Sequence, residues 1–313
     1  MKQATLKLLV FLSALTAIIL SIKGISNRPG GISHPTNFSK QTQINKGTTF
    51  YFIGSSRVRS GVAPNIIEPH FENTNVVNLG IIGGTFLSNC IVADHIIQQE
   101  GDKVLFIELS PLQDNVPSGL STFASKYEIN LLASILRITS HFSLSEKAVM
   151  FGNIVNQRIF STISLTHDIQ SIISFDEIQK ERRAGLASSY AGIDRFGVSS
   201  FLTYNEIEGV SYDTNLLSKY HQTISFLKNL ADQHQAQLIF FLPITFNRQA
   251  ERDIVIPLYN TLPDEMKLEY SKHFLDQMAR SKYLHNRNHL NQQGAEAFSQ
   301  MIVPFVKNKT DKN

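Results

Sequence analysis

The stretch "YFIGSSRVRSG", residues 51–61, places two serines and an arginine directly after a short apolar run. The run from Tyr51 to Ile53 stops at Gly54, and a polar segment continues to Gly61. This pattern has two interpretations: a plain β-turn, or a strand end that presents a serine hydroxyl as a nucleophile. The second interpretation requires a base elsewhere in the chain and a fold that brings the base to the serine.

The rest of the chain alternates apolar runs with amphipathic segments. Four runs are expected to be strands with little polar alternation: Phe50–Ile53, Asn75–Gly80, Lys103–Ser110 and Gln237–Pro243. Three segments with apolar side chains every three or four residues are expected to be helices: Thr85–Gln99, Thr214–His234 and a last helix from near Asn291. Buried strands that alternate with helices predict an α/β fold, a doubly wound (flavodoxin-like) parallel sheet with helices on both faces.

Composition limits the classes of function. The 313 residues are 42% hydrophobic and 18% charged, with a formal net charge of +3, which is typical of a globular protein with a large core. Basic residues are scattered, so nucleic acid is not an expected partner. The single cysteine, Cys90, excludes a disulfide within the chain and is interpreted as a core residue, because it lies in an apolar helical pattern. No Cys/His cluster has the spacing of a zinc site.

The N-terminus resembles a targeting segment. Residues 1–23 contain two early lysines and then an apolar stretch from Leu8 to Ile22, which is short for a membrane span but suits a signal segment. A bulky residue stands where cleavage favours a small one, so we expect an uncleaved signal-anchor; the alternatives are a cleaved signal peptide with secretion, or a buried helix. Residues 24–48, rich in Gly, Pro, Ser, Thr and Asn, predict a linker. The main domain, residues 49–307, is then expected outside the cytoplasm, in the periplasm or at the cell surface.

Three loops should meet at one edge of the predicted sheet. Gly54–Ser56 follows the first strand, Gly80–Thr85 the second and Ser110–Asn115 the third. In parallel sheets the ligand site lies beyond the carboxyl ends of the strands. Residues 111–212 form a long insert of helical or mixed and loop-like segments, without a clear pattern.

Serine catalysis needs a hydroxyl, a base within hydrogen-bond reach and donors for the oxyanion. Ser56 can supply the hydroxyl and also its own N–H, and Gly83 or Gly84 can supply a second N–H because glycine permits close approach of the backbone. The candidate base is His289, in "NHLN" directly before the last helix. Arg57 is open to two interpretations, like Arg59: contact with an anionic substrate, or a solvated turn.

These motifs together resemble the SGNH (GDSL-like) hydrolase superfamily, especially its membrane-anchored extracytoplasmic branch that modifies cell-surface polymers. "FIGSSRVRSG" resembles the first family block and implies that Ser56 is the nucleophile. "NLGIIGGT" resembles the second block and implies that Gly83 joins Ser56 in the oxyanion hole. "NRNHLNQQGA" resembles the last block, Asp-x-x-His, and implies that His289 is the base. The resemblance covers residues 50–115 and 214–305.

The chain departs from the family pattern in two places. Asn286 stands where the family has the aspartate that orients the histidine; its amide oxygen can still accept the imidazole N–H but brings no charge, unless an acid such as Asp276 assists. In the third block the family has an oxyanion-hole asparagine, and here Leu112 is near that position; Asn115 is close in sequence but is not assigned the role.

The resemblance implies a serine esterase or O-acyltransferase that acts on an acylated extracytoplasmic glycan or other surface polymer, with Ser56 and His289 as catalytic residues and Asn286 as orienting residue. It implies no metal and no organic cofactor. The alternative is a catalytically silent SGNH-fold scaffold or binding subunit of an assembly that modifies cell-envelope polymers. The asparagine in the last block and the unmatched third block favour this alternative.

Overall fold

The structure is a computed structural model that describes residues 47–112, 120, 129–163, 201–208, 214–246, 249–286 and 288–310. The predicted signal-anchor at 1–23 lies outside these residues, and so does the predicted linker except for its last two positions. The described residues belong to one compact unit, formed by 45–154 and 189–313, apart from 155–163, which group with a second unit. Within the described part of the chain, no helix has both the length and the apolar character needed to cross a membrane.

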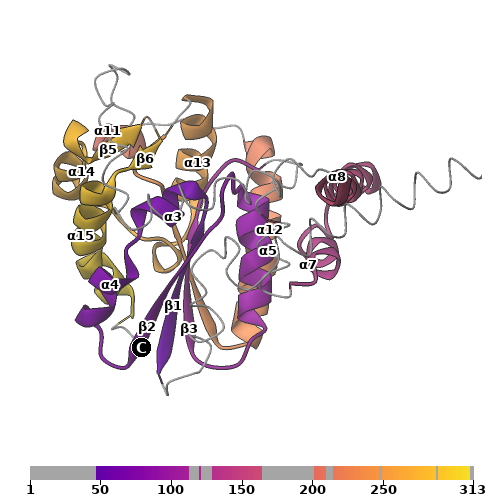
Figure 1. Cartoon of the computed structure of the whole chain (residues 1–313), viewed down its shortest axis with the longest axis horizontal. Coiled ribbons are helices and arrows are strands. Elements are labelled where there is room, and N and C mark those ends of the chain that lie inside the picture. The colour runs from indigo at the N-terminus through magenta and orange to yellow at the C-terminus, as the bar shows by residue number, and fades with distance from the viewer. Residues whose placement is uncertain are drawn as a thin grey trace, which may run out of the picture. The chain divides into compact units, whose positions relative to one another are not determined.

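Four parallel strands form the central sheet, in the order β2-β1-β3-β4 (Figure 1). They are β1 (Thr48–Gly54), β2 (Thr74–Gly80), β3 (Lys103–Glu108) and β4 (Ala236–Phe241). Every residue of β3 is buried, because this strand lies between two others and helices cover the sheet. The prediction of an α/β protein with a parallel sheet is therefore confirmed.

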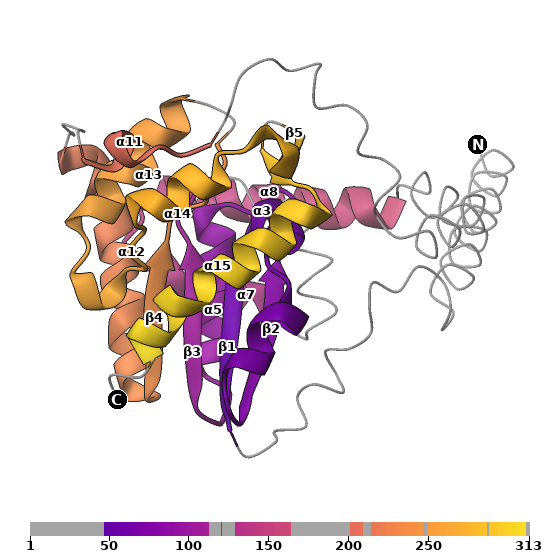
Figure 2. The same cartoon turned by 90° about the vertical axis from the view of Figure 1, so that its left-hand side faces the viewer.

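Helices pack on both faces of the sheet (Figures 1 and 2). One face carries α5 (Phe86–Ile97) and α12 (Thr214–Gln233), and the other carries α3 (Ser56–Gly61), α4 (Pro64–Ile67) and α15 (Gln292–Thr310). Cys90 on α5 is fully buried, as expected for a core residue, and burial together with the nearby charge of Asp94 raises the pKa of its thiol.

The strand register brings the first three strand ends to one edge of the sheet. Gly54 at the end of β1 pairs with Gly80 at the end of β2, and Ile53 pairs with Ile107 near the end of β3. The segments that follow these strands therefore leave the sheet side by side, as the sequence predicts.

Residues 249–290, for which the sequence analysis names no helix or strand, contain regular structure. They form α13 (Gln249–Thr261), α14 (Lys272–Met278) and a small hairpin of β5 (Leu284–Asn286) and β6 (His289–Leu290). The helix α13 contains a proline, Pro257, which interrupts the pattern by which a helix is recognised in a sequence. Its apolar side chains are nevertheless buried, so tertiary packing maintains the helix.

Part of the long insert is also described. It contains α7 (Leu131–Ile138), α8 (Leu144–Ile163) and α11 (Tyr204–Glu208). The helix α7 packs on α5, where Arg137 forms an ion pair with the buried carboxylate of Asp94. Residues 113–119, 121–128, 164–200 and 209–212 of the insert lie outside the description.

Candidate active site

The serine pair begins a short helix rather than a plain turn. Ser55 caps α3, with its side chain accepting the backbone N–H of Arg57, and Ser56 is the first helical residue. N–H groups in the first turn of a helix have no acceptor within the helix, so the Ser56 N–H does not take part in the helical ladder. This arrangement fixes Ser56 at the carboxyl end of β1.

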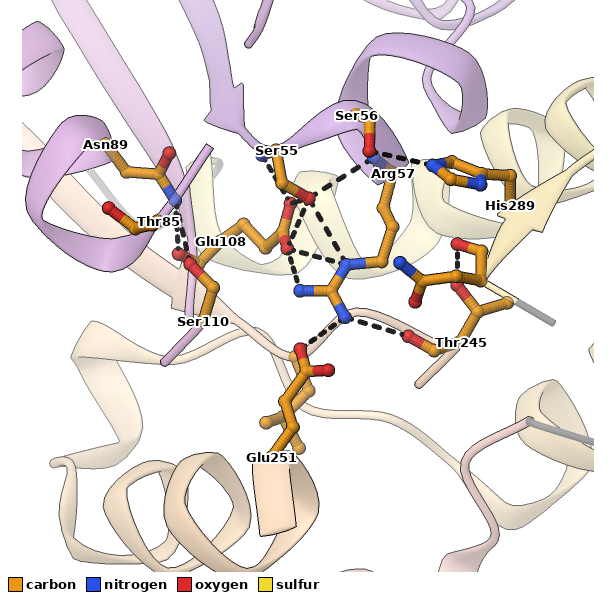
Figure 3. A network of polar contacts seen from close by, with 12 residues as sticks. Ser55, Ser56, Arg57, Thr85, Asn89, Glu108, Ser110, Thr245, Glu251 and His289 are labelled. Atoms are coloured by element: carbon orange, nitrogen blue, oxygen red, sulfur yellow. Dashed lines mark hydrogen bonds and ion pairs between the residues drawn. The ribbon is translucent and has the colours of Figure 1, made fainter. Parts of the chain in front are cut away.

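The hairpin β5–β6 brings the candidate base to the serine. The Ser56 Oγ lies 2.7 Å from Nε2 of His289, although 233 residues separate them along the chain (Figure 3). A hydroxyl at this distance can donate its proton directly to a neutral imidazole nitrogen. The structure thus brings together the nucleophile and the base that the sequence analysis nominated.

Asn286 lies on the opposite side of the imidazole. Its Oδ1 is 2.9 Å from Nδ1 of His289 and also accepts the backbone N–H of Asn288 at 2.9 Å. Because a backbone N–H can only donate, this second contact identifies the amide oxygen and excludes the flipped amide. The oxygen then requires the proton of His289 on Nδ1, which leaves Nε2 as the acceptor for the Ser56 hydroxyl.

The surroundings of His289 favour its neutral form. Burial lowers the pKa of His289 from its usual value of 6.5, and interactions with Arg57 and His285 lower it further, while Glu108 acts in the opposite direction. Asp276, the acid suggested as an aid to Asn286, is exposed on α14 and is not among the charges that shift this pKa. The carboxylate that acts on His289 is therefore Glu108, which the sequence analysis did not select.

The glycine loop after β2 lies against the serine turn. Ile81 donates its N–H to the carbonyl of Gly54 at 2.8 Å, and a Cβ at Gly84 would lie 3.0 Å from the Cα of Ser55. Gly83 has a φ of 68°, a left-handed conformation that disfavours other residues. The loop is thus positioned beside Ser56, and the oxyanion role of Gly83 stays a prediction.

A buried carboxylate lies under the serine turn. Glu108 ends β3 with its side chain fully buried, and it accepts the N–H of Ser55 at 2.8 Å and the Ser55 hydroxyl at 2.9 and 3.0 Å. The available signal in the sequence was the glutamate directly after the apolar run Val104–Ile107, because a charge at the end of a buried strand is rarely left unpaired.

Arg57 supplies the partner of this carboxylate. Its guanidinium contacts Oε1 of Glu108 through Nη2 at 2.6 Å, Oε1 of Glu251 through Nη1 at 2.5 Å and the carbonyl of Thr245 at 3.1 Å (Figure 3). Burial acts to lower the pKa of Arg57, but the two carboxylates outweigh it and the pKa is raised. Its side chain is only 8% exposed, so the interpretation of Arg57 as part of a solvated turn is wrong, and its contact with an anionic substrate stays a prediction. The residue joins α3 to β3 and α13.

No family model matches the chain, and no curated protein matches its sequence. The interpretation of the site therefore rests on its own geometry.

In the third family block, the segment after β3, no described residue supplies a side-chain amide to the oxyanion hole. Leu112 has an apolar side chain, and its N–H donates to the hydroxyl of Tyr220; Asn115 lies outside the description. Asn89 is close by on α5, but its Nδ2 donates to the carbonyl of Glu108 at 3.0 Å and to Ser110 Oγ at 3.3 Å. That amide therefore joins α5 to the end of β3.

Among the described residues, no group of three or more His, Cys, Asp and Glu side chains has the placement needed to bind a metal. The site contains the hydroxyl of Ser56 in contact with the imidazole of His289, and the amide of Asn286 on the other side of that imidazole. The ion pairs of Arg57 with Glu108 and Glu251 lie beneath the serine turn. This set of groups is suited to nucleophilic attack on a carbonyl carbon.

Proposed function

We propose that this chain is an SGNH-like serine esterase or O-acyltransferase. The observation that carries the proposal is the continuous relay from Asn286 through His289 to Ser56, with contacts of 2.9 and 2.7 Å. A silent scaffold has no need of a serine hydroxyl and an imidazole at this distance, so the relay favours the enzyme. The strand order β2-β1-β3-β4 supports the finer assignment of a doubly wound, flavodoxin-like sheet, with the serine next to the point where the strand order reverses.

The proposed reaction begins with attack of the Ser56 Oγ on an ester carbonyl carbon, while Nε2 of His289 accepts the hydroxyl proton. The C–O bond to the alcohol then breaks, and the imidazolium returns its proton to the departing alkoxide, which leaves an acyl group on Ser56. Water completes hydrolysis, or a sugar hydroxyl completes transfer, with His289 again accepting the proton. The N–H groups of Ser56 and Gly83 are the proposed donors to the oxyanion.

Asn286 affects the electrostatics of the proposed mechanism. Its amide oxygen maintains the required tautomer but adds no full negative charge to the imidazolium, and in a serine protease the change of Asp to Asn lowers kcat by about 10⁴. In this chain the carboxylate of Glu108 favours the protonated imidazole, whereas Arg57 opposes it. We therefore propose a slow enzyme with a neutral base at rest.

The proposed substrate is an acylated glycan or other polymer outside the cytoplasm, with the protein attached to the membrane through residues 1–23. This part of the proposal rests on the apolar stretch from Leu8 to Ile22 and on the resemblance to the extracytoplasmic branch.

Turnover of a small acetyl ester tests the proposed reaction. We expect release of the alcohol by the wild-type chain, and loss of the enzymatic rate in Ser56→Ala and in His289→Ala. Ser60→Ala is the matched control, since Ser60 is an exposed serine one turn further along the same helix. Equal rates in the wild type and Ser56→Ala would support the scaffold instead. Adding a soluble glycan acceptor and analysing it for a new ester then separates transfer from hydrolysis.

A further inference from the structure

The segment after β4 contacts both halves of the proposed site. Thr245 is 2% exposed, and its backbone carbonyl accepts the Nη1–H of Arg57 at 3.1 Å. Its side-chain hydroxyl donates to the backbone carbonyl of Asn288 at 2.9 Å. Arg57 directly follows the candidate nucleophile and Asn288 directly precedes the candidate base, so a single buried threonine contacts both neighbours.

These contacts close a ring of hydrogen bonds. From Thr245 the ring continues through the Asn288 N–H to Oδ1 of Asn286, at 2.9 Å, and from that oxygen to Nδ1 of His289, also at 2.9 Å. The contact of His289 with Ser56 at 2.7 Å, and the chain from Ser56 to Arg57, complete it. In a closed ring, the loss of one bond frees the groups on both sides of it to move.

The base needs such an anchor because its own hairpin is small. β5 has three residues and β6 has two, and their register is irregular between Leu284 and Asn286. A two-stranded hairpin is at best marginally stable without further packing. Contacts with the rest of the domain therefore help to determine where His289 lies: the packing of the buried Leu284 and Leu290, and the hydrogen bond from Thr245.

Contacts with the end of the long insert hold the segment that contains Thr245. Thr245 forms an antiparallel bridge with Phe201, and the N–H of Leu202 donates to the carbonyl of Ile244 at 2.8 Å. The next residue, Phe246, is fully buried and has the guanidinium groups of Arg57 and Arg252 over its ring, at 5.7 and 5.4 Å from the centroid. The end of the long insert thus supports the segment that contacts the site.

We propose that the Thr245 hydroxyl is a positioning group that sets His289 at hydrogen-bond distance from Ser56. The proposal rests on the proposed function, because its effect is on the activation of Ser56. It assigns no contact with the substrate to Thr245, and it gives the insert's end, residues 201–208, a supporting role in the site.

The test is the rate at which a serine-reactive fluorophosphonate labels the purified chain. Thr245→Val keeps the shape of the side chain and removes the donor to Asn288; we expect labelling about tenfold slower, the value of one net hydrogen bond of about 1.4 kcal/mol. Thr245→Ser restores the hydroxyl and should recover most of the rate. Thr139→Val is the matched control, because Thr139 is a buried threonine at the C-cap of α7 whose hydroxyl donates to the backbone carbonyl of Ile135, and it should label like the wild type.

Two results separate this proposal from the proposed function. If the wild type labels at Ser56 and a folded Thr245→Val labels within twofold of it, the positioning role is overturned and the esterase proposal stands. If the wild type does not label, the proposed function is overturned, and the positioning role is overturned with it. Should Thr245→Val not fold, Thr245→Ala carries the same test, and failure of both to fold would show that the hydroxyl is needed for folding and would also overturn the positioning role.

Discussion

Glu108 lies under Ser55, and its carboxylate accepts both the backbone N–H and the hydroxyl of that residue, at 2.8 and 2.9 Å. Glu108 is the last residue of β3, and Ser55 is the N-cap of α3, the helix that begins at Ser56. The contact therefore joins α3 to the centre of the sheet. Arg57 neutralises the buried charge from the other side. The position of Ser56 therefore depends on a charge pair that makes and breaks no bond in the proposed reaction, although both charges shift the pKa of His289.

Glu108→Gln tests how much the ion pair of Glu108 and Arg57 stabilises the fold. The substitution keeps the shape but removes the charge, and breaking one partner of a buried ion pair costs about 3–5 kcal/mol. We expect the free energy of unfolding, measured with urea, to fall by about that amount. Asp232→Asn is the control, since Asp232 pairs with Lys228 on an exposed face of α12, and the expected change is below about 1 kcal/mol. Equal small losses in both variants would show that the buried pair does not stabilise the fold.

Gly80→Ala tests the packing of the serine helix on β2. A Cβ at Gly80 would overlap the backbone of Arg59 in α3, which cannot move away as a flexible side chain can. We expect a loss of about 1–3 kcal/mol in the free energy of unfolding and slower fluorophosphonate labelling. Gly152→Ala in α8 meets no atom within 4 Å and should be neutral or gain about 0.5–1 kcal/mol. A fully stable, fully reactive Gly80→Ala would contradict the close packing of α3 on β2.

The sequence allowed the parallel sheet, its main helices and the Ser56–His289 pair to be predicted, for identifiable reasons. Buried strands such as Lys103–Glu108 contain an apolar run, here Val104–Ile107, and the glycine-rich loop and the histidine motif each stand at a recognisable boundary. The roles of Glu108, Arg57 and Thr245 could not be predicted from the local sequence. Each depends on partners more than 40 residues away, and nothing local distinguishes a buried arginine from a solvated one.

The helices α13 and α14 were missed for a related reason. The proline inside α13 opposes helix formation locally, and burial of side chains such as Val255 and Leu258 overrides it. Because Glu251 lies on α13, missing this helix also hid the second carboxylate that contacts Arg57.

Asn286→Asp tests the orienting role of the amide. A carboxylate can accept the same two N–H groups, from His289 and Asn288, and adds a negative charge that stabilises the imidazolium. We expect the esterase rate to rise or stay level. We also expect the half-point of its acidic limb to move to higher pH, because the charge raises the pKa of His289. A collapse of activity in a folded variant would mean that Asn286 has a different role.

The pH dependence of labelling tests the state of His289. Only the neutral imidazole can accept the Ser56 proton, so the rate falls as pH drops through the pKa of His289. Burial and the charge of Arg57 hold that pKa below its usual 6.5. The pH at which the labelling rate falls to half should therefore lie below 6.5. A half-point above 6.5 would contradict the cause assigned to the shift.

The most direct measurement is mass spectrometry of the chain after reaction with a fluorophosphonate, with the modified peptide sequenced. We expect one adduct, on Ser56, which is lost in Ser56→Ala and in His289→Ala and retained in Ser60→Ala. An unmodified wild-type chain, or an adduct that persists in Ser56→Ala, would contradict the claim that Ser56 and His289 form a working nucleophile and base.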